Sequence, residues 1–433
     1  MYSFKSIDSF SKFGSYTGNG STSNIIETGF EPAFLMTKRT DTAGYNWYIW
    51  DNKRNTTNPR YLNLQADRAN AESDYSAYPH DFLSNGFEVK TSNAAFNASG
   101  GTYIYMAFAA DPDTEAPTVA RSFSTVTYTG TGSSNSITSL GFEPSLTWIK
   151  GRTNTASHQI FDTIRGATKG LNSDATGAEF TNTGMLTSFD SDGFTLGGQG
   201  SVNGSGVNYV AWNWKADDNE PTVNTEGTID SIVSANANAG FSIVKWIADG
   251  NGFSSSIGHG LSAAPELIIT KDTDSANDWI VTSSLFSNTI RNFLKLNLTN
   301  AIDTSSIDSY TLDATTFKIA PRNNTSGKEI ISYCFHSVAG YSKFGSYTGN
   351  GGTLNVDVGF AADFVMVKRT SSTGDWYIFD SVRGNYERLF PNLDNVEDTS
   401  TNQISLTSTG FTSGEGSTNI SGSTYIYMAF KIN

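Results

Sequence analysis

The ten residues SKFGSYTGNG at positions 11–20 occur again, unchanged, at positions 342–351. An identity of this length, 331 positions apart (342 − 11), indicates an internal repeat of a folding unit. Within the stretch, Phe13 and Tyr16 flank small and polar residues, and Gly18-Asn19-Gly20 supplies positions at which the chain reverses easily. The stretch therefore predicts the opening strand and turn of a repeated β-module.

The sequence that follows this stretch also recurs, and it marks four modules. GFEP at 29–32 leads into an apolar run, and TYIYMAF closes the first copy at 102–108 and the last copy at 424–430. The middle copies are looser, and YVAW at 209–212 and SYCF at 332–335 mark their closing strands. The predicted modules, which we name modules one to four, are residues 1–112, 118–217, 226–339 and 340–433.

The composition favours an all-β fold. The 433 residues include 41 glycines, 13% are aromatic and 16% are charged, and Gly and Asn separate short apolar runs. This pattern is typical of all-β sandwiches. Each module has roughly six to eight strand-sized runs, which is enough for a small two-sheet sandwich with little or no helix. The segment 284–298 is the one place where we expect a helical turn.

Charge and hydropathy argue against several kinds of partner. The net charge of −14 speaks against nucleic acid, because binding phosphates requires clustered Lys and Arg. No apolar run is long enough to span a bilayer, and the start MYSFKSIDSF lacks the pattern of a signal peptide. The one cysteine, Cys334, excludes an internal disulfide and is expected to be a small buried residue. We expect no nucleic-acid partner and no membrane insertion.

Two acidic segments that contain proline have the composition of linkers. They are AADPDTEAP at 109–117 and ADDNEPTVNTE at 216–226. No such spacer follows module three, because Ala339-Gly340 leads directly to Tyr341. We therefore expect modules three and four to pack as a stiffer pair than any other neighbours.

The first residues of the chain resemble the end of module three. With the offset of 331 (342 − 11), they align with the passage from module three into module four. We expect residues 2–8 to form a strand, which either completes a sheet of another subunit or lies on its own module. The first alternative implies a homo-oligomer. The aligned pairs are Tyr2 with Tyr333, Phe4 with Phe335, Ser6 with Ser337, Phe10 with Tyr341, and Ser11 with Ser342.

One charged pattern, Asp-x-x-Arg, recurs after the second aromatic strand of three modules. Such carboxylates could be catalytic or bind sugars. Alternatively, each Asp and Arg braces a turn through a charge-assisted hydrogen bond. Because the pattern repeats from module to module, we favour the structural interpretation. The pairs are Asp51 with Arg54, Asp162 with Arg165, and Asp380 with Arg383.

Metal, cofactor and enzyme signatures are weak. Asp190 and Asp192 flank a short turn but lack the further oxygen ligands of an EF-hand, and the four histidines show no zinc-binding spacing. The acidic linkers could hold calcium through Asp111, Asp113 and Glu115 or through Asp217, Asp218 and Glu220, but we favour solvated spacers. No nucleophile elbow, phosphate-binding glycine loop or helical histidine pair is present. We therefore expect neither a cofactor nor a catalytic site.

The loops after the Asp-x-x-Arg turns differ between modules, at about 55–80, 166–185, 284–310 and 384–400. Variable loops on a repeated scaffold are where recognition is usually placed. The first loop is aromatic, and its side chains could stack on sugar faces or pack against their own module. These candidate ligand-binding residues are Tyr61, Tyr75, Tyr78 and His80.

The repeated strings also resemble a known family. SKFGSYTGNG, GFEPAFLMTKRT at 29–40, WYIWDNKR at 47–54 and SGGTYIYMAF at 99–108 resemble tandem β-modules in structural proteins of tailed bacteriophages, especially marine and cyanobacterial ones. Module two resembles a companion form of these modules through FDSDGF at 189–194. The resemblance implies concanavalin-like or laminin-G-like jelly-roll sandwiches and a place on the exterior of the virion.

The sequence thus leads to a functional hypothesis with two alternatives. We expect a virion structural protein, either a tail-fibre or appendage component or a capsid-surface component. Its expected partners are other virion proteins, further copies of itself and host-surface glycans bound through the module loops. The first alternative is a lectin-like adhesin whose purpose is recognition alone. The second is a polysaccharide-degrading enzyme.

Overall fold

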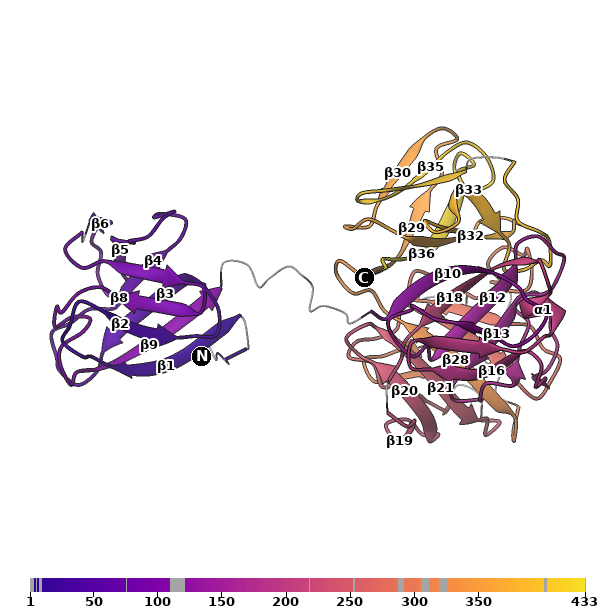
Figure 1. Cartoon of the computed structure of the whole chain (residues 1–433), viewed down its shortest axis with the longest axis horizontal. Coiled ribbons are helices and arrows are strands. Elements are labelled where there is room, and N and C mark those ends of the chain that lie inside the picture. Colours follow the sequence, from indigo (N-terminus) through magenta and orange to yellow (C-terminus); the bar gives the residue numbers. More distant parts are fainter. Residues whose placement is uncertain are drawn as a thin grey trace. The chain divides into compact units, whose positions relative to one another are not determined.

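The computed structural model shows an all-β protein in which the paired strands are antiparallel (Figure 1). The chain divides into two compact units, unit one (residues 1–117) and unit two (residues 118–433). The structure describes residues 4, 6–7, 10–74, 76–109, 121–217, 219–251, 254–286, 292–304, 311–318, 325–400 and 403–432.

Unit one consists of two antiparallel sheets with a hydrophobic core between them. Leu35 and Trp50 from the larger sheet and Phe87 from the smaller one have no exposed surface in this core. The larger sheet contains, in spatial order, β1 (Ser11–Thr17), β9 (Thr102–Ala109), β3 (Pro32–Arg39), β4 (Tyr48–Asp51), β5 (Leu62–Gln65) and β6 (Ser73–Asp74). The smaller sheet contains β2 (Asn24–Glu27), β8 (Gly86–Val89) and β7 (His80–Leu83).

Module two follows the same plan at the start of unit two. Its larger sheet contains β10 (Phe123–Thr129), β18 (Asn208–Trp214), β12 (Leu146–Gly151) and β13 (Gln159–Asp162). Its smaller sheet contains β11 (Asn135–Ile137), β17 (Gly193–Leu196) and β16 (Leu186–Asp190). The remaining elements are the hairpin of β14 (Lys169–Gly170) and β15 (Phe180–Thr181) and the short helix α1 (Gly200–Asn203).

Modules three and four repeat this plan. The larger sheet of module three contains β19 (Thr222–Asn224), β20 (Ser231–Asn236), β21 (Phe241–Ile247), β28 (Glu329–Phe335), β23 (Leu267–Asp272), β24 (Ile280–Ser283) and β25 (Leu294–Lys295), and the smaller one contains β22 (Ile257–Gly258), β27 (Thr316–Lys318) and β26 (Thr311–Leu312). The larger sheet of module four contains β29 (Ser342–Thr348), β36 (Thr424–Phe430), β31 (Phe364–Arg369), β32 (Trp376–Asp380) and β33 (Gly384–Leu389), and the smaller one contains β30 (Leu354–Asp357), β35 (Gly410–Ser413) and β34 (Ile404–Thr407).

The repeated stretch SKFGSYTGNG forms an equivalent strand in both places. Strand β1 pairs with β9 in the same register in which β29 pairs with β36, so that Ser11 and Ser342 each lie opposite the last Phe of TYIYMAF. Its first glycine is required by packing: a Cβ atom on Gly14 would lie 2.7 Å from the hydroxyl of Tyr105. A Cβ on Gly18 would clash with the carbonyl of Ala98. These close approaches explain why the motif needs glycine at both positions.

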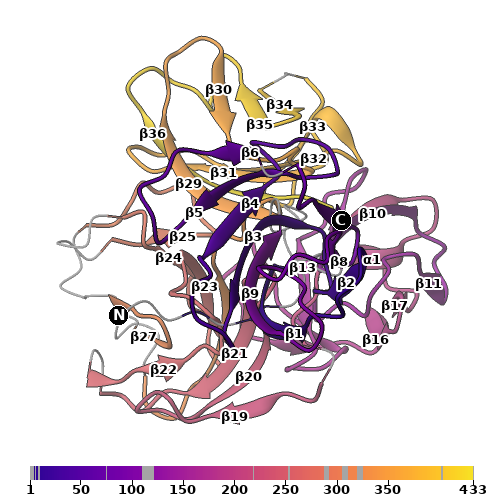
Figure 2. The same cartoon turned by 90° about the vertical axis from the view of Figure 1, so that its left-hand side faces the viewer.

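The structure corrects the expected position of one linker. Part of the segment 216–226 is a strand, because β19 pairs with β20 of module three. Modules two, three and four lie in one compact unit (Figures 1 and 2), so modules three and four do not form a separate pair. The other predicted linker lies, from residue 110 onward, outside the described residues.

The expected strand over residues 2–8 is not formed by its described part. Phe4 and Ser6 lie outside strands, and Ile7 makes a single bridge with Ser11 of the same chain. Residues 2, 3, 5 and 8 lie outside the described residues. The described part of 284–298 contains β25 and two single hydrogen-bonded turns but no helix, and residues 287–291 lie outside the described residues.

Candidate functional site: the shared core of modules two, three and four

The larger sheets of modules two, three and four meet in one hydrophobic core. Each module contributes seven side chains from equivalent register positions, and none of these side chains is more than 4% exposed. Module two contributes Leu146, Trp148, Ile160, Leu171, Val210, Trp212 and Trp214. Module three contributes Leu267, Ile269, Val281, Leu294, Ile331, Tyr333 and Phe335. Module four contributes Phe364, Met366, Ile378, Leu389, Ile426, Met428 and Phe430.

Aromatic rings from all three modules pack around Phe430. Its ring centroid lies 5.1 Å from that of Phe123, 5.9 Å from that of Trp214 and 6.1 Å from that of Phe335. A cavity of only about 10 Å³, lined by apolar groups, remains inside the core. The core is therefore closely packed, and its stability depends on residues from each of the three modules.

The Asp-x-x-Arg turns lie at the edge of this core and include a third charged residue. In module four, Arg383 Nε donates to Asp380 at 2.6 Å, and its Nη1 donates to Glu397 at 2.9 Å. Asp162 and Arg165 of module two repeat this geometry, with Glu179 as the third member. In both modules the side chains of the Asp and the Arg have no exposed surface.

The turn of module one has the same members in a different environment. Arg54 Nε donates to Asp51 at 2.6 Å and its Nη1 donates to Glu72 at 3.0 Å. Here the Arg and Asp side chains are 21% and 23% exposed. The difference in burial arises because the core of unit two covers the turns of modules two and four.

Two of these carboxylates also accept a hydrogen bond from a neighbouring module. Trp212 Nε1 of module two donates to Asp380 of module four at 2.9 Å, and the Tyr333 hydroxyl of module three donates to Asp162 of module two at 2.7 Å. At the third junction, between modules four and three, both the donor and the carboxylate are replaced. Met428 has the register position of Trp212 and Tyr333, and Ser283 has that of the Asp. The missing donor and the missing carboxylate thus occur together.

Backbone hydrogen bonds join the three modules in a closed ring. Each bond connects equivalent positions: the N–H of a loop in one module and the carbonyl directly after β12, β23 or β31 of the next. Module two therefore contacts three, three contacts four, and four contacts two. The bonds run from Glu179 N to Thr273 O at 2.8 Å, from Ile302 N to Thr370 O at 3.0 Å, and from Glu397 N to Arg152 O at 2.9 Å.

Two aromatic side chains add further hydrogen bonds between modules. Trp279 Nε1 donates to the carbonyl of Asn172 at 2.8 Å, and Trp376 Nε1 donates to that of Lys295 at 3.0 Å. At the equivalent position of module two, His158 accepts from Trp148 Nε1 of the same module at 2.8 Å, and burial lowers the pKa of its imidazole well below the usual value. The two bonds between modules make the three-module arrangement specific as well as apolar.

The aromatic residues predicted to bind sugars do not form an exposed platform. His80 has no exposed surface and lies against Trp50, with ring centroids 4.1 Å apart. Tyr78 is half-buried and packs against the core of unit one. Tyr61 is half-buried, and Tyr75 lies outside the described residues. His80 is therefore a core residue, because the alternation along its strand turns it inward, and it offers no face to a ligand.

Because His80 is buried and uncharged, unit one is expected to lose stability in mild acid. Burial lowers its pKa from 6.5 to about 3, so the unfolded state takes up a proton near pH 6.5 and the folded state resists it. The free energy of unfolding then falls as the pH drops below 6.5, by up to about 1.4 kcal/mol per pH unit. Chemical unfolding between pH 6.5 and 5 measures this slope. His80→Phe should reduce it in unit one, and an unchanged slope would contradict the assignment.

The acidic residues that the sequence analysis considered as metal ligands include two that accept hydrogen bonds within the protein. Asp192 accepts hydrogen bonds from the backbone N–H groups of Ser139 and Gly141, and Asp190 accepts one from Thr195 Oγ1. In the part of the chain that the structure describes, no group of three or more His, Cys, Asp or Glu side chains is placed to hold a metal ion. The acidic residues Asp111, Asp113, Glu115 and Asp218 lie outside that part, whereas Asp217 and Glu220 are exposed in it.

Cys334 lies in the core between the sheets of module three. It has no exposed surface, and burial raises the pKa of its thiol. A thiol in this environment stays protonated, which is the behaviour of a small packing residue. Among the described residues, no helix is long and apolar enough to cross a membrane.

Comparison with known proteins gives one result. The chain matches no curated protein and no solved structure. A family model covers it almost from end to end, over residues 1–112 and 119–433. The chain belongs to the family defined by this model, which is described as a domain of unknown function (DUF7483).

Proposed function

We propose that this protein is a structural component of a bacteriophage virion, exposed on the exterior of the particle as part of a tail fibre or appendage or of the capsid surface. In this proposal it is not an enzyme and needs no cofactor. Its partners are other virion proteins and further copies of the same chain. Adhesion to host-surface glycans is a second role of the module loops.

The shared core of unit two is the observation that carries this proposal. The side chains of Asp162, Arg165, Asp380 and Arg383 have no exposed surface, and the two carboxylates accept hydrogen bonds from neighbouring modules. These buried charged side chains hold a scaffold together. A rigid block of three β-modules suits a protein whose work is architectural.

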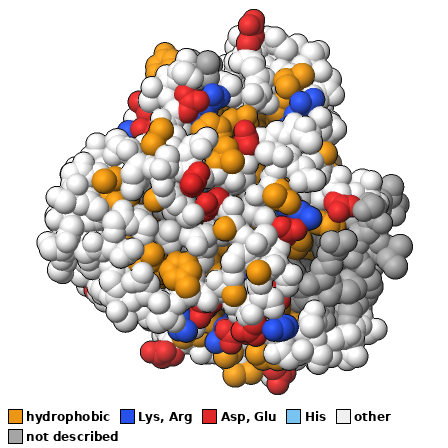
Figure 3. Space-filling model, turned by 90° about the vertical axis from the view of Figure 1, so that its right-hand side faces the viewer, with side chains coloured by type: hydrophobic (Ala, Val, Ile, Leu, Met, Phe, Trp, Pro, Cys, Tyr) orange, Lys and Arg blue, Asp and Glu red, His pale blue; other side chains and the backbone are white. Residues whose placement is uncertain are grey.

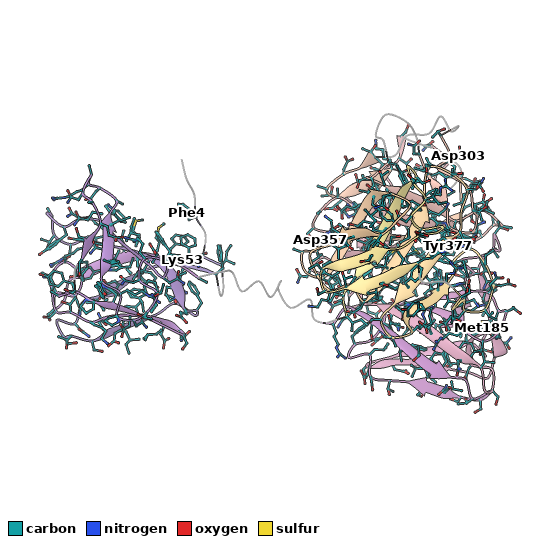
Figure 4. The ribbon with its side chains drawn as sticks, turned by 90° about the horizontal axis from the view of Figure 1, so that it is seen from above. Phe4, Lys53, Met185, Asp303, Asp357 and Tyr377 are labelled. Atoms are coloured by element: carbon teal, nitrogen blue, oxygen red, sulfur yellow. The ribbon has the colours of Figure 1, made fainter. Side chains whose placement is uncertain are left out.

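We further propose that the four modules are jelly-roll sandwiches of the concanavalin or laminin-G kind. The support is the recurring plan of a larger and a smaller antiparallel sheet, with the closing strand in the interior of the larger sheet. In module four, Tyr377 (labelled in Figure 4) packs in the core between the two sheets. The resemblance of the repeated strings to phage β-modules points the same way.

A surface hollow favours glycan adhesion as the second role. It has a volume of about 390 Å³, lies where modules three and four meet, and is lined by polar and apolar groups in about equal measure, Phe293 among them. It belongs to the loop 284–310, one of the four variable loops, and so fits the expectation that recognition is placed there. The other residues that line the hollow are Lys295, Asn300, Ala301, Ile302, Asp303, Thr304 and Thr373. On the face of unit two that Figure 3 shows, hydrophobic side chains lie in small groups among polar ones.

Particles that lack this protein test the proposal. We expect them to show a missing external feature by electron microscopy, slower adsorption to host cells, or both. Antibodies against the chain should label the outside of intact wild-type particles. Particles that assemble and adsorb normally without the chain would contradict both roles.

The same preparation distinguishes the alternatives. Loss of adsorption from particles of unchanged appearance, with binding of the purified chain to host envelope glycans, would favour a lectin-like adhesin. Release of reducing ends from envelope polysaccharide by the purified chain would favour a degrading enzyme.

A further inference from the structure

We propose that three copies of this chain associate through module one, each contributing the outer face of its larger sheet. This inference goes beyond the proposed function and does not depend on it. It rests on a comparison inside the chain, because the sheet faces of the other three modules show how such a face is covered.

The outer face of module one has the same apolar positions as the shared core. They are Phe34, Met36, Ile49, Leu64, Ile104, Met106 and Phe108, and each occupies the register position of one of the seven core residues of module four. All seven residues are identical in type to their counterparts in module four, which are, in the same order along the chain, Phe364, Met366, Ile378, Leu389, Ile426, Met428 and Phe430.

Burial is what distinguishes the two faces. In module four these side chains are at most 4% exposed, whereas Ile104 and Leu64 of module one are 38% and 37% exposed. The other five side chains of the module-one face are only half-buried. An apolar sheet face of this size in contact with water marks an interaction surface.

The occupant of the face follows from what covers it in the other modules. Each of the three faces in unit two is covered by the equivalent faces of the other two modules, and the ring closes with three members. The module-one face has the residues of module four at the same positions. The partner that fits it is therefore the same face on two further copies of the chain.

The backbone groups at the edge of the face support the same arrangement. The positions equivalent to the ring of backbone hydrogen bonds are the N–H of Glu72 and the carbonyl of Thr40, since Glu72 bonds Arg54 as Glu397 bonds Arg383. Both residues are exposed, and among the described residues these two backbone groups make no hydrogen bond. In unit two the equivalent groups bond between modules at 2.8–3.0 Å.

One corner of the face already has the geometry of the shared core. Phe4, labelled in Figure 4, lies 5.7 Å from Phe13 and 6.5 Å from Phe108 between ring centroids. In unit two, Phe335 of module three lies 5.7 Å from Phe344 and 6.1 Å from Phe430. Phe4 thus reproduces a contact that module three makes with module four.

The chemistry of the face indicates an association driven by apolar burial. Met106 stands where Trp212 and Tyr333 donate to a neighbouring carboxylate, and it has no hydrogen to donate. Asp51 keeps its bonds to Arg54 and stays partly exposed. We therefore expect the association to strengthen with concentration and to resist salt better than an ionic interface.

The full chain tests the proposal through its mass in solution, measured by light scattering over a range of concentrations. The expected value is about 140 kDa, three times the 46.7 kDa of one chain. The double variant Ile104→Asp with Leu64→Asp should reduce the mass threefold, because it places charges on the face. Ile25→Asp is the matched control, since Ile25 is 61% exposed on the smaller sheet, and it should leave the mass unchanged.

Disulfide trapping provides a second measurement that does not depend on weakening the protein. In a chain with Thr40→Cys and Glu72→Cys, oxidation should link chains into dimers and trimers and no larger species. The native Cys334 is buried and should not interfere. A wild-type chain that stays monomeric, a mass of two chains, an unchanged mass in the double variant, or links that never reach a trimer would each overturn the proposal.

Discussion

Replacing Arg383 with alanine is expected to lower the free energy of unfolding of unit two by about 3–5 kcal/mol. Arg383 neutralises Asp380 in a site without exposed surface, and it also bonds Glu397 and the carbonyl of Ile378. Without the guanidinium, Asp380 keeps only the N–H donors of Trp212 and of the backbone. A buried carboxylate without a countercharge is among the most costly defects in a protein core.

The equivalent change in module one is the control for this prediction. Arg54→Ala removes the same pair from a turn whose side chains are 21% and 23% exposed. Water then solvates Asp51, and the expected cost is about 1 kcal/mol or less. Scanning calorimetry of the full chain compares the two variants. Equal losses of unfolding free energy in Arg54→Ala and Arg383→Ala would contradict the claim that burial makes the module-four pair more important for stability.

Phe430→Ala is expected to lower the free energy of unfolding of unit two by about 3–5 kcal/mol, as other large-to-small changes in closely packed cores do. The side chain is 1% exposed and contacts Phe123 and Trp214 of module two and Phe335 of module three. The cavity would open where the three modules meet. We therefore expect the loss to be shared by all three modules and not confined to module four.

An exposed aromatic residue of the same module is the control. Tyr386 is 54% exposed, and Tyr386→Ala should change stability by less than about 0.5 kcal/mol. Chemical unfolding followed by tryptophan fluorescence measures both variants. If Phe430→Ala unfolds module four alone and leaves the transition of modules two and three unchanged, the modules do not share a core.

The strands were predictable from the sequence, whereas their assembly was not. The identity of SKFGSYTGNG in two places identified the repeat, and short apolar runs identified the β structure. The closing strand of module four, Thr424–Phe430, also contained an unused signal: apart from its first residue, it is apolar at every position. Such a strand is buried on both faces, which one two-layer sandwich does not explain.

The sequence revealed two of the three charged residues of each Asp-x-x-Arg turn, and the third was hidden for a physical reason. Asp-x-x-Arg has a fixed spacing because both residues belong to one turn. The third member lies across a loop of variable length, 18 residues after Arg54 (72 − 54) but 14 after Arg383 (397 − 383). Spacing alone therefore does not reveal it. Module three has Ser283 in place of the Asp, and module four has Met428 in place of the hydrogen-bond donor. These two changes can be recognised as one missing contact only when the strand registers of both modules are known.

The sequence left two alternatives open for the aromatic loop of module one, stacking on sugars or packing against its own module, because side-chain direction depends on strand register. Tyr78 and His80 lie two residues apart and both turn towards Phe96 in the core of unit one. The sequence shows the residue types but not which face of the strand is covered. One residue of shift would have placed His80 in solvent.

Hydrogen exchange of the full chain, resolved to the closing strands β18, β28 and β36, tests the central claim that modules two, three and four share one core. Strands that open only when the whole unit unfolds exchange with one common free energy. We expect the most protected amides of the three strands to give the same value. Three clearly different values, one for each module, would contradict the shared core.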